Sequence, residues 1–488
     1  MVKELFLKNI IFILITFLLL SISSCAKNIA TGERQLVILS EAEENNIGAK
    51  EHPNIIKSFG GIYKDPKLKK YISSIGNKIA QNSDMPDIRW TFTILDSPIV
   101  NAFALPGGYV YVTRGLLSLA NDEAEISSVI GHEIAHVTAR HAAQRHAKST
   151  LSNIGLDILN IVVGQPIVTN LAGIGVQGVL SAFSRSEELE ADRLGIKYII
   201  KSKYDPEGSL RFLTRLDKLT KILTKHQQNA ISSIFSTHPK TIDRIDISKE
   251  SVPENIQYKR YKKDYLRAID NMIYGDSSSQ GIIKDNKFFH IELDFSFIFP
   301  KNYKIINNDN SIIIFKDNKD VVIIFDGLQS QEGITLLETA ESIYNRSDIK
   351  LYEELFIDDQ SAIFFDEKII IKYEGRDYFR RTYLINWTNN RIWRFSLLLN
   401  PLNKEINLDE VNNIAISLHK LTSQEKIDGR PQYIKIIKTK LNDTPNILSN
   451  KMAITEKKLE MFCILNGLDL NESNKILPEG SLIKMIVN

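Results

Sequence analysis

The apolar residues of the first 220 positions mostly recur every three or four residues, a spacing that predicts helices. The clearest run lies at 126–137. Asp122 and Glu123 precede it with a capping side chain and an acidic group that favour a helix start. Four more helices are expected at 40–57, at 66–79, around 188–192 and from 206 onward. We expect the first two of these to pack on the 126–137 helix.

Two stretches between these helices alternate apolar and polar residues, which predicts strands at 89–95 and 109–113 and hence a small sheet. After residue 281, the alternation of apolar and polar residues is the main pattern. The apolar residues from Ile291 to Phe299 predict one strand that ends at Pro300. Further strands are expected near 312, 321, 363, 378 and 393, with helices near 336 and 408. The chain after residue 430 predicts a strand, two short helices and a final strand.

The expected architecture is therefore an α+β protein of several domains. We assign a mainly helical domain with a small sheet to 25–255, a linker to 256–281, an α+β domain to 282–425 and a small βααβ domain to 430–488. The last domain resembles a LysM-type module, because it carries Asn442-Asp443-Thr444 and the turn Leu465-Asn466-Gly467-Leu468. This resemblance is compatible with binding to peptidoglycan or to envelope proteins.

Length, charge and cysteine content narrow the function. A chain of 488 residues is too long for a single core, and 61 basic against 59 acidic residues give a net charge of +2. This balance creates no field that would steer the chain to nucleic acid, and we expect no nucleic-acid partner. The two cysteines, Cys25 and Cys463, exclude a disulfide framework.

Residues 1–24 have the pattern of a secretory signal. Lys3 and Lys8 precede an apolar run at 10–20, which is shorter than a membrane span. The run leads to Ile-Ser-Ser before Cys25, which resembles the lipobox of bacterial lipoproteins. The resemblance implies cleavage before Cys25, a lipid on its sulfur, and a membrane-anchored position outside the cytoplasm, at the periplasmic face of a Gram-negative envelope. The alternative is an uncleaved anchor with an incidental cysteine.

The segment Gly131–His141 reads G-H-E-I-A-H-V-T-A-R-H. His132 and His136 are one helical turn apart, so one face can present both imidazoles to a single metal ion, and Glu133 lies beside them to act on water. Catalytic zinc usually has three protein ligands. The segment 183–192 contains the best third donor, because Glu188 and Asp192 share a helical face. Glu188 can bind the metal while Asp192 accepts a hydrogen bond from a ligand histidine. One zinc ion per chain is expected.

This combination resembles the gluzincin metallopeptidases, specifically the family that contains HtpX, the CAAX prenyl endopeptidase and BepA. Further matches are N-A-F-A-L-P-G-G-Y-V-Y-V from Asn101, the extension Arg140-His141, and S-T-H-P-K-T-I-D-R from Ser236. The resemblance implies a zincin-type domain. It also implies that His238 faces the zinc, either to stabilise an oxyanion or to occupy the open metal position, with support from Arg244. The alternative for His238 is a structural cap. We assign no catalytic role to Arg140 or His141, and Glu190 is expected to point elsewhere.

Two segments beside the expected site have two interpretations each. Residues 101–112 can form a sheet edge that holds an extended substrate backbone, or a hairpin that serves only the core. The residues of this edge are Asn101, Ala102, Phe103, Gly107 and Gly108. Residues 151–180 are apolar, but polar residues interrupt them, so they are not assigned as a membrane span. They form either a cover over the cleft or an internal hairpin of core helices.

The sequence therefore predicts a zinc-dependent endopeptidase of the bacterial cell envelope. The family implies polypeptide substrates, in particular misfolded or mis-assembled envelope proteins. Glu133 would act as the general base, and zinc would polarise the peptide carbonyl. Two alternatives stay open. One is a non-catalytic assembly factor or holdase, against which the intact Glu133 argues. The other is a peptidoglycan-binding lipoprotein.

Overall fold

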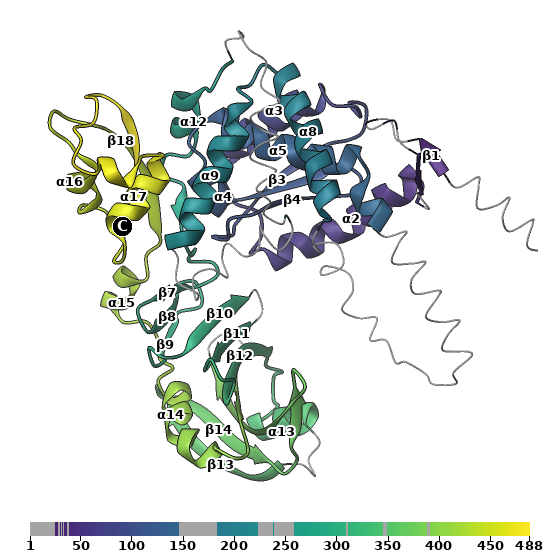
Figure 1. The fold of residues 1–488 in the computed structure, drawn as a ribbon. Helices are drawn as coiled ribbons and strands as arrows, with labels where there is room; N and C mark the ends of the chain where they lie inside the picture. The colour runs from purple at the N-terminus through teal and green to yellow at the C-terminus, as the bar shows by residue number, and fades with distance from the viewer. Residues whose placement is uncertain are drawn as a thin grey trace, which may run out of the picture. The chain divides into compact units, whose positions relative to one another are not determined.

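The computed structural model divides the chain into two compact units, Met1–Tyr274 with Tyr433–Val487, and Gly275–Gln432 with Asn488 (Figure 1). The boundary at Tyr274 lies in the stretch 256–281 that was expected to be a linker. The structure describes residues 25–27, 30, 32, 34–36, 39–145, 183–222, 238, 258–308, 311–344, 349–387 and 391–488. The expected signal at 1–24 and the segment 151–180 lie outside these residues. In the described part of the chain, none of the helices has the length and apolar character needed to cross a bilayer.

The first two helices of the first unit begin where the sequence predicts. Helix α2 covers Glu41–Ser58 and helix α3 covers Pro66–Ala80, and the side chains of Ser40 and Asp65 cap their first turns. Helix α3 packs as expected, because its apolar side joins the core cluster of α5 (Glu123–Thr138). The expected packing of α2 on α5 is wrong. Its one buried large apolar side chain, Ile55, lies in a cluster with residues of the sheet instead.

The predicted small sheet has three strands in the order β3–β5–β4. Strand β3 (Thr91–Leu95) is parallel to β5 (Tyr109–Thr113), and β4 (Ala102–Leu105) is antiparallel to β5, so β4 is an edge strand. Gly107 and Gly108 form the turn between β4 and β5 with φ of +81° and +85°. A Cβ on Gly108 would lie 2.7 Å from the carbonyl oxygen of Arg89. Both glycines are therefore required by the turn itself.

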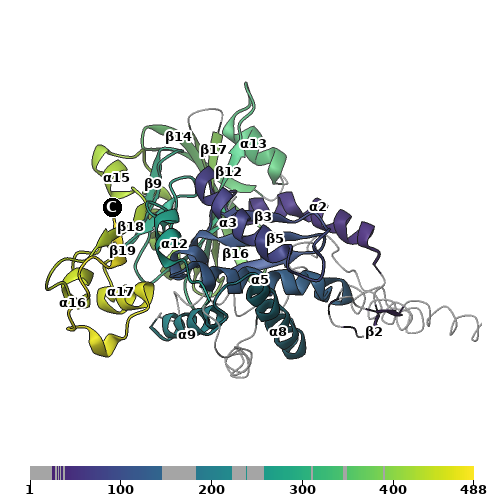
Figure 2. The ribbon, with the colours of Figure 1, turned by 90° about the horizontal axis from the view of Figure 1, so that it is seen from above.

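Helices α4 (Arg114–Leu119), α5, α8 (Arg185–Lys201) and α9 (Glu207–Ile222) belong to the same unit. Figure 2 shows α8 alongside α5. A pair of glycines allows this close approach. A Cβ on Gly195 would lie 2.9 Å from the backbone nitrogen of His132, and a Cβ on Gly131 would lie 2.9 Å from Cγ2 of Ile199. The backbones of α5 and α8 are therefore in direct contact beside the first ligand histidine.

The first unit is completed by short elements from both ends of the chain. Strands β1 (Cys25–Lys27) and β2 (Arg34–Leu36) pair with each other. The expected linker contains helix α12 (Lys262–Ala268) and strand β6 (Ile273–Tyr274). The C-terminal module, defined here as Tyr433–Val487, has the strand, helix, helix, strand order that the sequence predicts. Its elements are β18 (Gln432–Lys438), α16 (Pro445–Ser449), α17 (Lys458–Asn466), the 3₁₀ helix η3 (Leu470–Glu472) and β19 (Leu482–Val487).

The second unit is β-rich, in agreement with the predicted α+β class. One sheet has three antiparallel strands, β7 (Ile282–Lys284), β8 (Lys287–His290) and β9 (Phe295–Ile298). The other has the order β10–β11–β12–β17–β16–β14–β13, with β15 paired to β16. Its strands are β10 (Lys304–Asn308), β11 (Ser311–Phe315), β12 (Val321–Gln329), β13 (Ile349–Ile357), β14 (Gln360–Glu367), β15 (Ile371–Tyr373), β16 (Arg376–Asn386) and β17 (Arg391–Leu399). The helices are α13 (Leu336–Ile343), α14 (Lys404–Ile416) and α15 (Ser423–Asp428).

One strand prediction in this unit is wrong in its first half. Residues 291–294 form a turn between β8 and β9, in which the N–H of Asp294 donates to the carbonyl of Ile291 at 3.3 Å. The alternation of Ile291 and Leu293 is therefore coincidental. The turn allows Phe288 to pair with Phe297, and both rings are fully buried. The free energy gained by burying these aromatic side chains exceeds what a longer strand would contribute.

Candidate metal centre

Helix α5 presents His132, Glu133 and His136 to the interior of the first unit. The side chain of Asp122 caps the helix by accepting from the N–H of Glu125 at 2.8 Å. The two histidines lie one turn apart, as predicted, and their Nε2 atoms are separated by 3.0 Å. Both side chains are buried, with exposed fractions of 8% for His132 and 3% for His136. The helix therefore directs two nitrogen lone pairs to one point inside the protein.

Helix α8 brings Glu188 and Asp192 to the same point. Oε2 of Glu188 lies 3.5 Å from Nε2 of His132, and its Oε1 lies 3.5 Å from Nε2 of His136. Oδ1 of Asp192 lies 2.8 Å from Nδ1 of His132. This contact places the proton of the His132 ring on Nδ1, so Nε2 keeps its lone pair for a metal. The structure thus brings together the ligand and acceptor positions that the helical spacing predicts.

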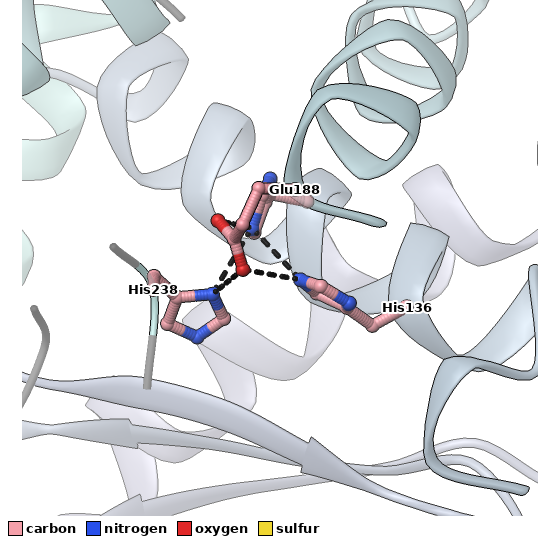
Figure 3. Close-up of side chains that lie close together, drawn as sticks. His136, Glu188 and His238 are labelled. Carbon is pink, nitrogen blue, oxygen red and sulfur yellow. Dashed lines mark hydrogen bonds and ion pairs between the residues drawn. The ribbon is translucent and has the colours of Figure 1, made fainter. Parts of the chain in front are cut away.

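His238 approaches the cluster from a separate segment. Its Nδ1 lies 2.8 Å from Oε1 of Glu188 (Figure 3). The same nitrogen lies 3.3 Å from Nε2 of His132. Its other ring nitrogen, Nε2, lies 3.4 Å from Oε1 of Glu133. His238 is only 3% exposed, so it belongs to the buried cluster and not to the surface. Through its two nitrogens it faces both the metal ligands and the predicted general base.

The four ligand side chains fit a zinc ion. One ligand atom each from His132, His136, Glu188 and His238 lies within 4.8 Å of the other three, and this is the one such cluster found in the described residues. Two imidazole nitrogens with lone pairs that face each other at 3.0 Å repel one another unless a cation lies between them. Nitrogen and carboxylate ligands in this number are the set that zinc prefers.

The protonation of two ligands supports metal binding. Burial holds the pKa of His136 well below its usual range, which keeps the ring neutral and its lone pair available. Burial also acts to raise the pKa of Glu188, but the imidazoles of His238, His132 and His136 outweigh this effect and hold that pKa well below its usual range. The carboxylate is therefore ionised, and it contributes negative charge toward the cation.

His141 and Glu190 form a second contact to the ligand set. The sequence did not predict it, because Glu190 was expected to point elsewhere and His141 was given no role. Nδ1 of His141 lies 2.8 Å from Nδ1 of His136, and Nε2 of His141 lies 2.9 Å from Oε2 of Glu190. Because Glu190 accepts the Nε2 proton, His141 can accept the Nδ1 proton of His136, which leaves Nε2 of His136 for the metal. The helix ends near Thr138, and Arg140 has φ of +58°, which turns His141 back toward His136.

The other residues predicted for the site lie in different parts of the structure. Arg244 lies outside the described residues. Ala102 and Phe103 are in the edge strand β4, directly after Asn101, while Gly107 and Gly108 are in the turn. Cys25 begins the short strand β1.

An apolar hollow borders Glu133 and His238. Its lining from α5 and α9 consists of Val129, Phe212, Leu213 and Leu216.

The region that holds the ligand set is similar to known metallopeptidases. Residues 66–251 match the model of Peptidase family M48, a range that contains all four ligands and Glu133. This part of the chain is similar to the beta-barrel assembly-enhancing proteases and to the OMA1 metalloendopeptidases.

Three curated relatives show the extent of this similarity. The beta-barrel assembly-enhancing protease of Yersinia pestis is 32% identical over 184 residues, which are 36% of this chain and 37% of that protein. The protein of the same name from Escherichia coli (strain K12) is 33% identical over 165 residues, 32% of this chain and 34% of that protein. Mitochondrial metalloendopeptidase OMA1 of Schizosaccharomyces pombe is 31% identical over 196 residues, 40% of this chain and 56% of that protein. The chain thus matches about a third to just over half of the length of these relatives.

We expect replacement of Glu190 by alanine to weaken zinc binding. Without its acceptor, His141 no longer fixes the orientation of His136, and the zinc dissociation constant should rise ~10- to 100-fold. Competition with a fluorescent zinc chelator measures this constant. Arg193→Ala, at an exposed position of the same helix, is the matched control. Equal zinc affinity of both variants would show that Glu190 does not support the site.

Proposed function

We propose that this protein is a zinc-dependent endopeptidase that cleaves polypeptides at the His132, His136, Glu188 and His238 cluster. The single observation that supports this most strongly is the position of Glu133. It is buried beside the ligand set, and it contacts His238 but is not itself one of the clustered ligands. A carboxylate in this position has no role in holding the metal. It is available to move protons during hydrolysis.

The chemistry follows from the roles of these side chains. Zinc, when bound, supplies a Lewis acid that polarises the peptide carbonyl and lowers the pKa of water to about 7. Glu133 takes the proton from the attacking water and passes it to the leaving amine. Asp192 and the pair of His141 and Glu190 hold the ligand rings in the orientation that the metal requires.

Two features beside the cluster are suited to an extended polypeptide. Strand β4 ends its sheet, and its length of four residues is enough to align a substrate backbone by strand addition. The apolar hollow next to Glu133 can accept an apolar side chain near the scissile bond. A polypeptide held at β4 with one apolar residue in this hollow is the substrate that we propose.

Replacement of Glu133 by glutamine tests the mechanism. The variant should retain zinc, because Glu133 is not among the clustered ligands, but its rate of casein cleavage should fall at least ~10²-fold through loss of the general base. Zinc content and cleavage are measured on the same preparation. Glu41→Gln, at an exposed position of α2, is the control and should cleave casein at the wild-type rate. Unchanged cleavage by Glu133→Gln would rule out this mechanism.

We further propose that His238 keeps the resting enzyme latent. Three protein ligands complete a catalytic zinc site and leave one position for water, so the imidazole of His238, a fourth ligand in the cluster, competes with water for that position. The contact between Nε2 of His238 and Glu133 also engages the general base. Substrate binding would then have to displace His238, which becomes free to face the developing oxyanion.

Replacement of His238 by alanine should therefore raise the basal cleavage of loosely folded casein, since the open position becomes accessible to water. If oxyanion stabilisation dominates instead, the rate should fall by ~10²- to 10³-fold. The zinc X-ray absorption edge, measured in parallel, reports whether an imidazole has left the metal. Wild-type rates together with a wild-type edge would contradict both roles and favour the structural cap.

The cellular setting is a proposal that rests on sequence and on the names of the relatives. The signal-like residues 1–24 and the lipobox-like Ile-Ser-Ser-Cys25 support a lipid-anchored protein outside the cytoplasm. Two of the relatives are named for beta-barrel assembly. We propose that envelope proteins that are misfolded or mis-assembled are the substrates.

Replacement of Cys25 by serine tests the anchor. If the sulfur of Cys25 carries the lipid, the variant should accumulate as an unprocessed precursor in the producing cells, and it should incorporate no labelled palmitate. Cys463→Ser is the matched control, because this cysteine is buried in α17 and should not affect labelling. Equal labelling of wild type and Cys25→Ser would remove the lipoprotein assignment.

A further inference from the structure

Lys484 is buried against the segment that leads into α5. This helix carries His132 and His136 and is called the metal helix below. Lys484 lies in β19 and is 1% exposed. Its side-chain nitrogen, Nζ, donates to the carbonyl oxygens of Ser118 at 2.7 Å and Ala120 at 2.8 Å, and it lies 3.4 Å from that of Leu119. Ser118 and Leu119 are the last two residues of α4, and Ala120 follows them in the junction to α5. One side chain of the C-terminal module thus contacts three consecutive carbonyls at the end of α4.

These carbonyls need an external partner. Helix α4 has six residues, all of them buried, and the chain leaves it at Ala120 in an extended conformation. The last carbonyls of a helix have no partner within the helix, and buried carbonyls without a partner are costly. An amino group offers N–H donors to such carbonyls, and burial together with the nearby Arg215 lowers the pKa of Lys484 well below its usual range. Lys484 matches this site through its hydrogen-bond donors.

Two neighbours of Lys484 fix the module on the same junction. The side chain of Asn466 accepts from the backbone N–H of Lys484 at 2.7 Å and donates to its carbonyl at 3.0 Å. Gly467 follows with φ of +67°, and a Cβ there would lie 2.8 Å from Nη2 of Arg215 and 2.9 Å from Nδ2 of Asn121. The end of α17 therefore lies directly against residues at the beginning of α5 and in α9.

Arg215 continues this connection into the metal helix. Its guanidinium group forms an ion pair with Glu125 through both terminal nitrogens, and it also donates to the carbonyl of Leu119 at 3.3 Å. Glu125 lies in the first turn of α5 and accepts from the backbone N–H of Asn121 at 2.8 Å. The first turn of the helix is thus held by α9, by the α4–α5 junction and by the C-terminal module.

The module also shares its backbone pairing and its core with the peptidase domain. The N–H of Asn271 donates to the carbonyl of Ile434, and the N–H of Ile434 donates to the carbonyl of Met272, both at 2.8 Å. Ile434 and Ile464 belong to the same buried cluster as Ile126 of the metal helix. These contacts are those of a domain core. They differ from the polar surface expected between independent domains.

We propose that the C-terminal module is a positioning element of the metal site, and that Lys484 is its positioning residue. By fixing the α4–α5 junction, Lys484 sets the position of the first turn of α5. A helix transmits that position to His132 and Glu133, two turns later, because its backbone hydrogen bonds make it stiff. The inference rests on the metal site of the proposed function, but it concerns metal affinity and not cleavage alone.

The test uses the full chain with Lys484→Met, which keeps an unbranched side chain of similar shape and removes the N–H donors. The zinc dissociation constant, measured by competition with a chelator, should rise ~2- to 30-fold. The kcat for casein should fall, with KM little changed, because β4 is held by β5 and not by Lys484. Lys475→Met is the matched control, since the side chain of Lys475 lies in the same module and is 68% exposed.

A second readout separates positioning from simple stabilisation. If Lys484 only stabilises the fold, Lys484→Met should lower the melting temperature equally with and without zinc. If it positions the site, the rise in melting temperature on addition of zinc should also become smaller, because this rise follows the zinc affinity. A variant with wild-type zinc affinity and a wild-type zinc-induced rise would overturn the proposal.

The milder variant Lys484→Gln keeps the test valid if Lys484→Met does not fold. Its amide retains donors on a shorter side chain, so a smaller increase in the zinc dissociation constant is expected, and an unchanged constant overturns the proposal. The outcome is independent of the proposed reaction. Failure of the peptidase mechanism would appear as unchanged cleavage by Glu133→Gln, whereas failure of the positioning role would appear in zinc affinity alone.

Discussion

The contact between helices α5 and α8 is the constraint on which the metal centre depends. Each helix contributes ligands, and the ligand atoms can meet only if the helix backbones approach closely. Gly131 and Gly195 permit this approach, because a side chain at either position would collide with the opposite helix. The charge of the cluster adds a second constraint. Several lone pairs and a carboxylate are buried together, which is stable only around a cation.

The orientation of the ligand rings is set by a layer of polar contacts behind them. His132 is held by Asp192, and His136 is held through His141 by Glu190. Both acidic residues come from α8, the helix that also supplies Glu188. A single helix therefore contributes one metal ligand and fixes the two ligands of its neighbour. Because α8 contacts both ligand histidines of α5, a small movement of α8 would affect both of them at once.

Local sequence signals predicted most of the helices and the metal ligands. Capping side chains such as Ser40, Asp65 and Asp122 lie at helix starts in the structure, and His132 and His136 lie one turn apart with their Nε2 atoms 3.0 Å from each other. The role of His141 could not be read from helical spacing, because the left-handed turn at Arg140 interrupts the helix. An isolated histidine directly after a ligand helix was the available signal.

The role of Lys484 and the division of the chain into units were harder to predict. Lys484 interrupts an otherwise apolar run at 482–487, and a lysine in a terminal strand is usually exposed to solvent. Only long-range contacts show that it is buried. The linker expected at 256–281 indicated a boundary. No local pattern indicated that the chain returns, at Tyr433, to the unit it left at Tyr274.

This return has a consequence for how the protein is made. Strand β18 pairs beside β6, and Lys484 contacts Ser118 across 366 positions of the sequence. The nascent chain therefore emerges with its metal helix complete but with the C-terminal partner of that helix still unsynthesised. Contacts between such distant residues form late in folding, because a long loop must close first. Residues 275–432 can fold separately during this delay. A newly made molecule would then complete its first unit only after β19 has left the ribosome.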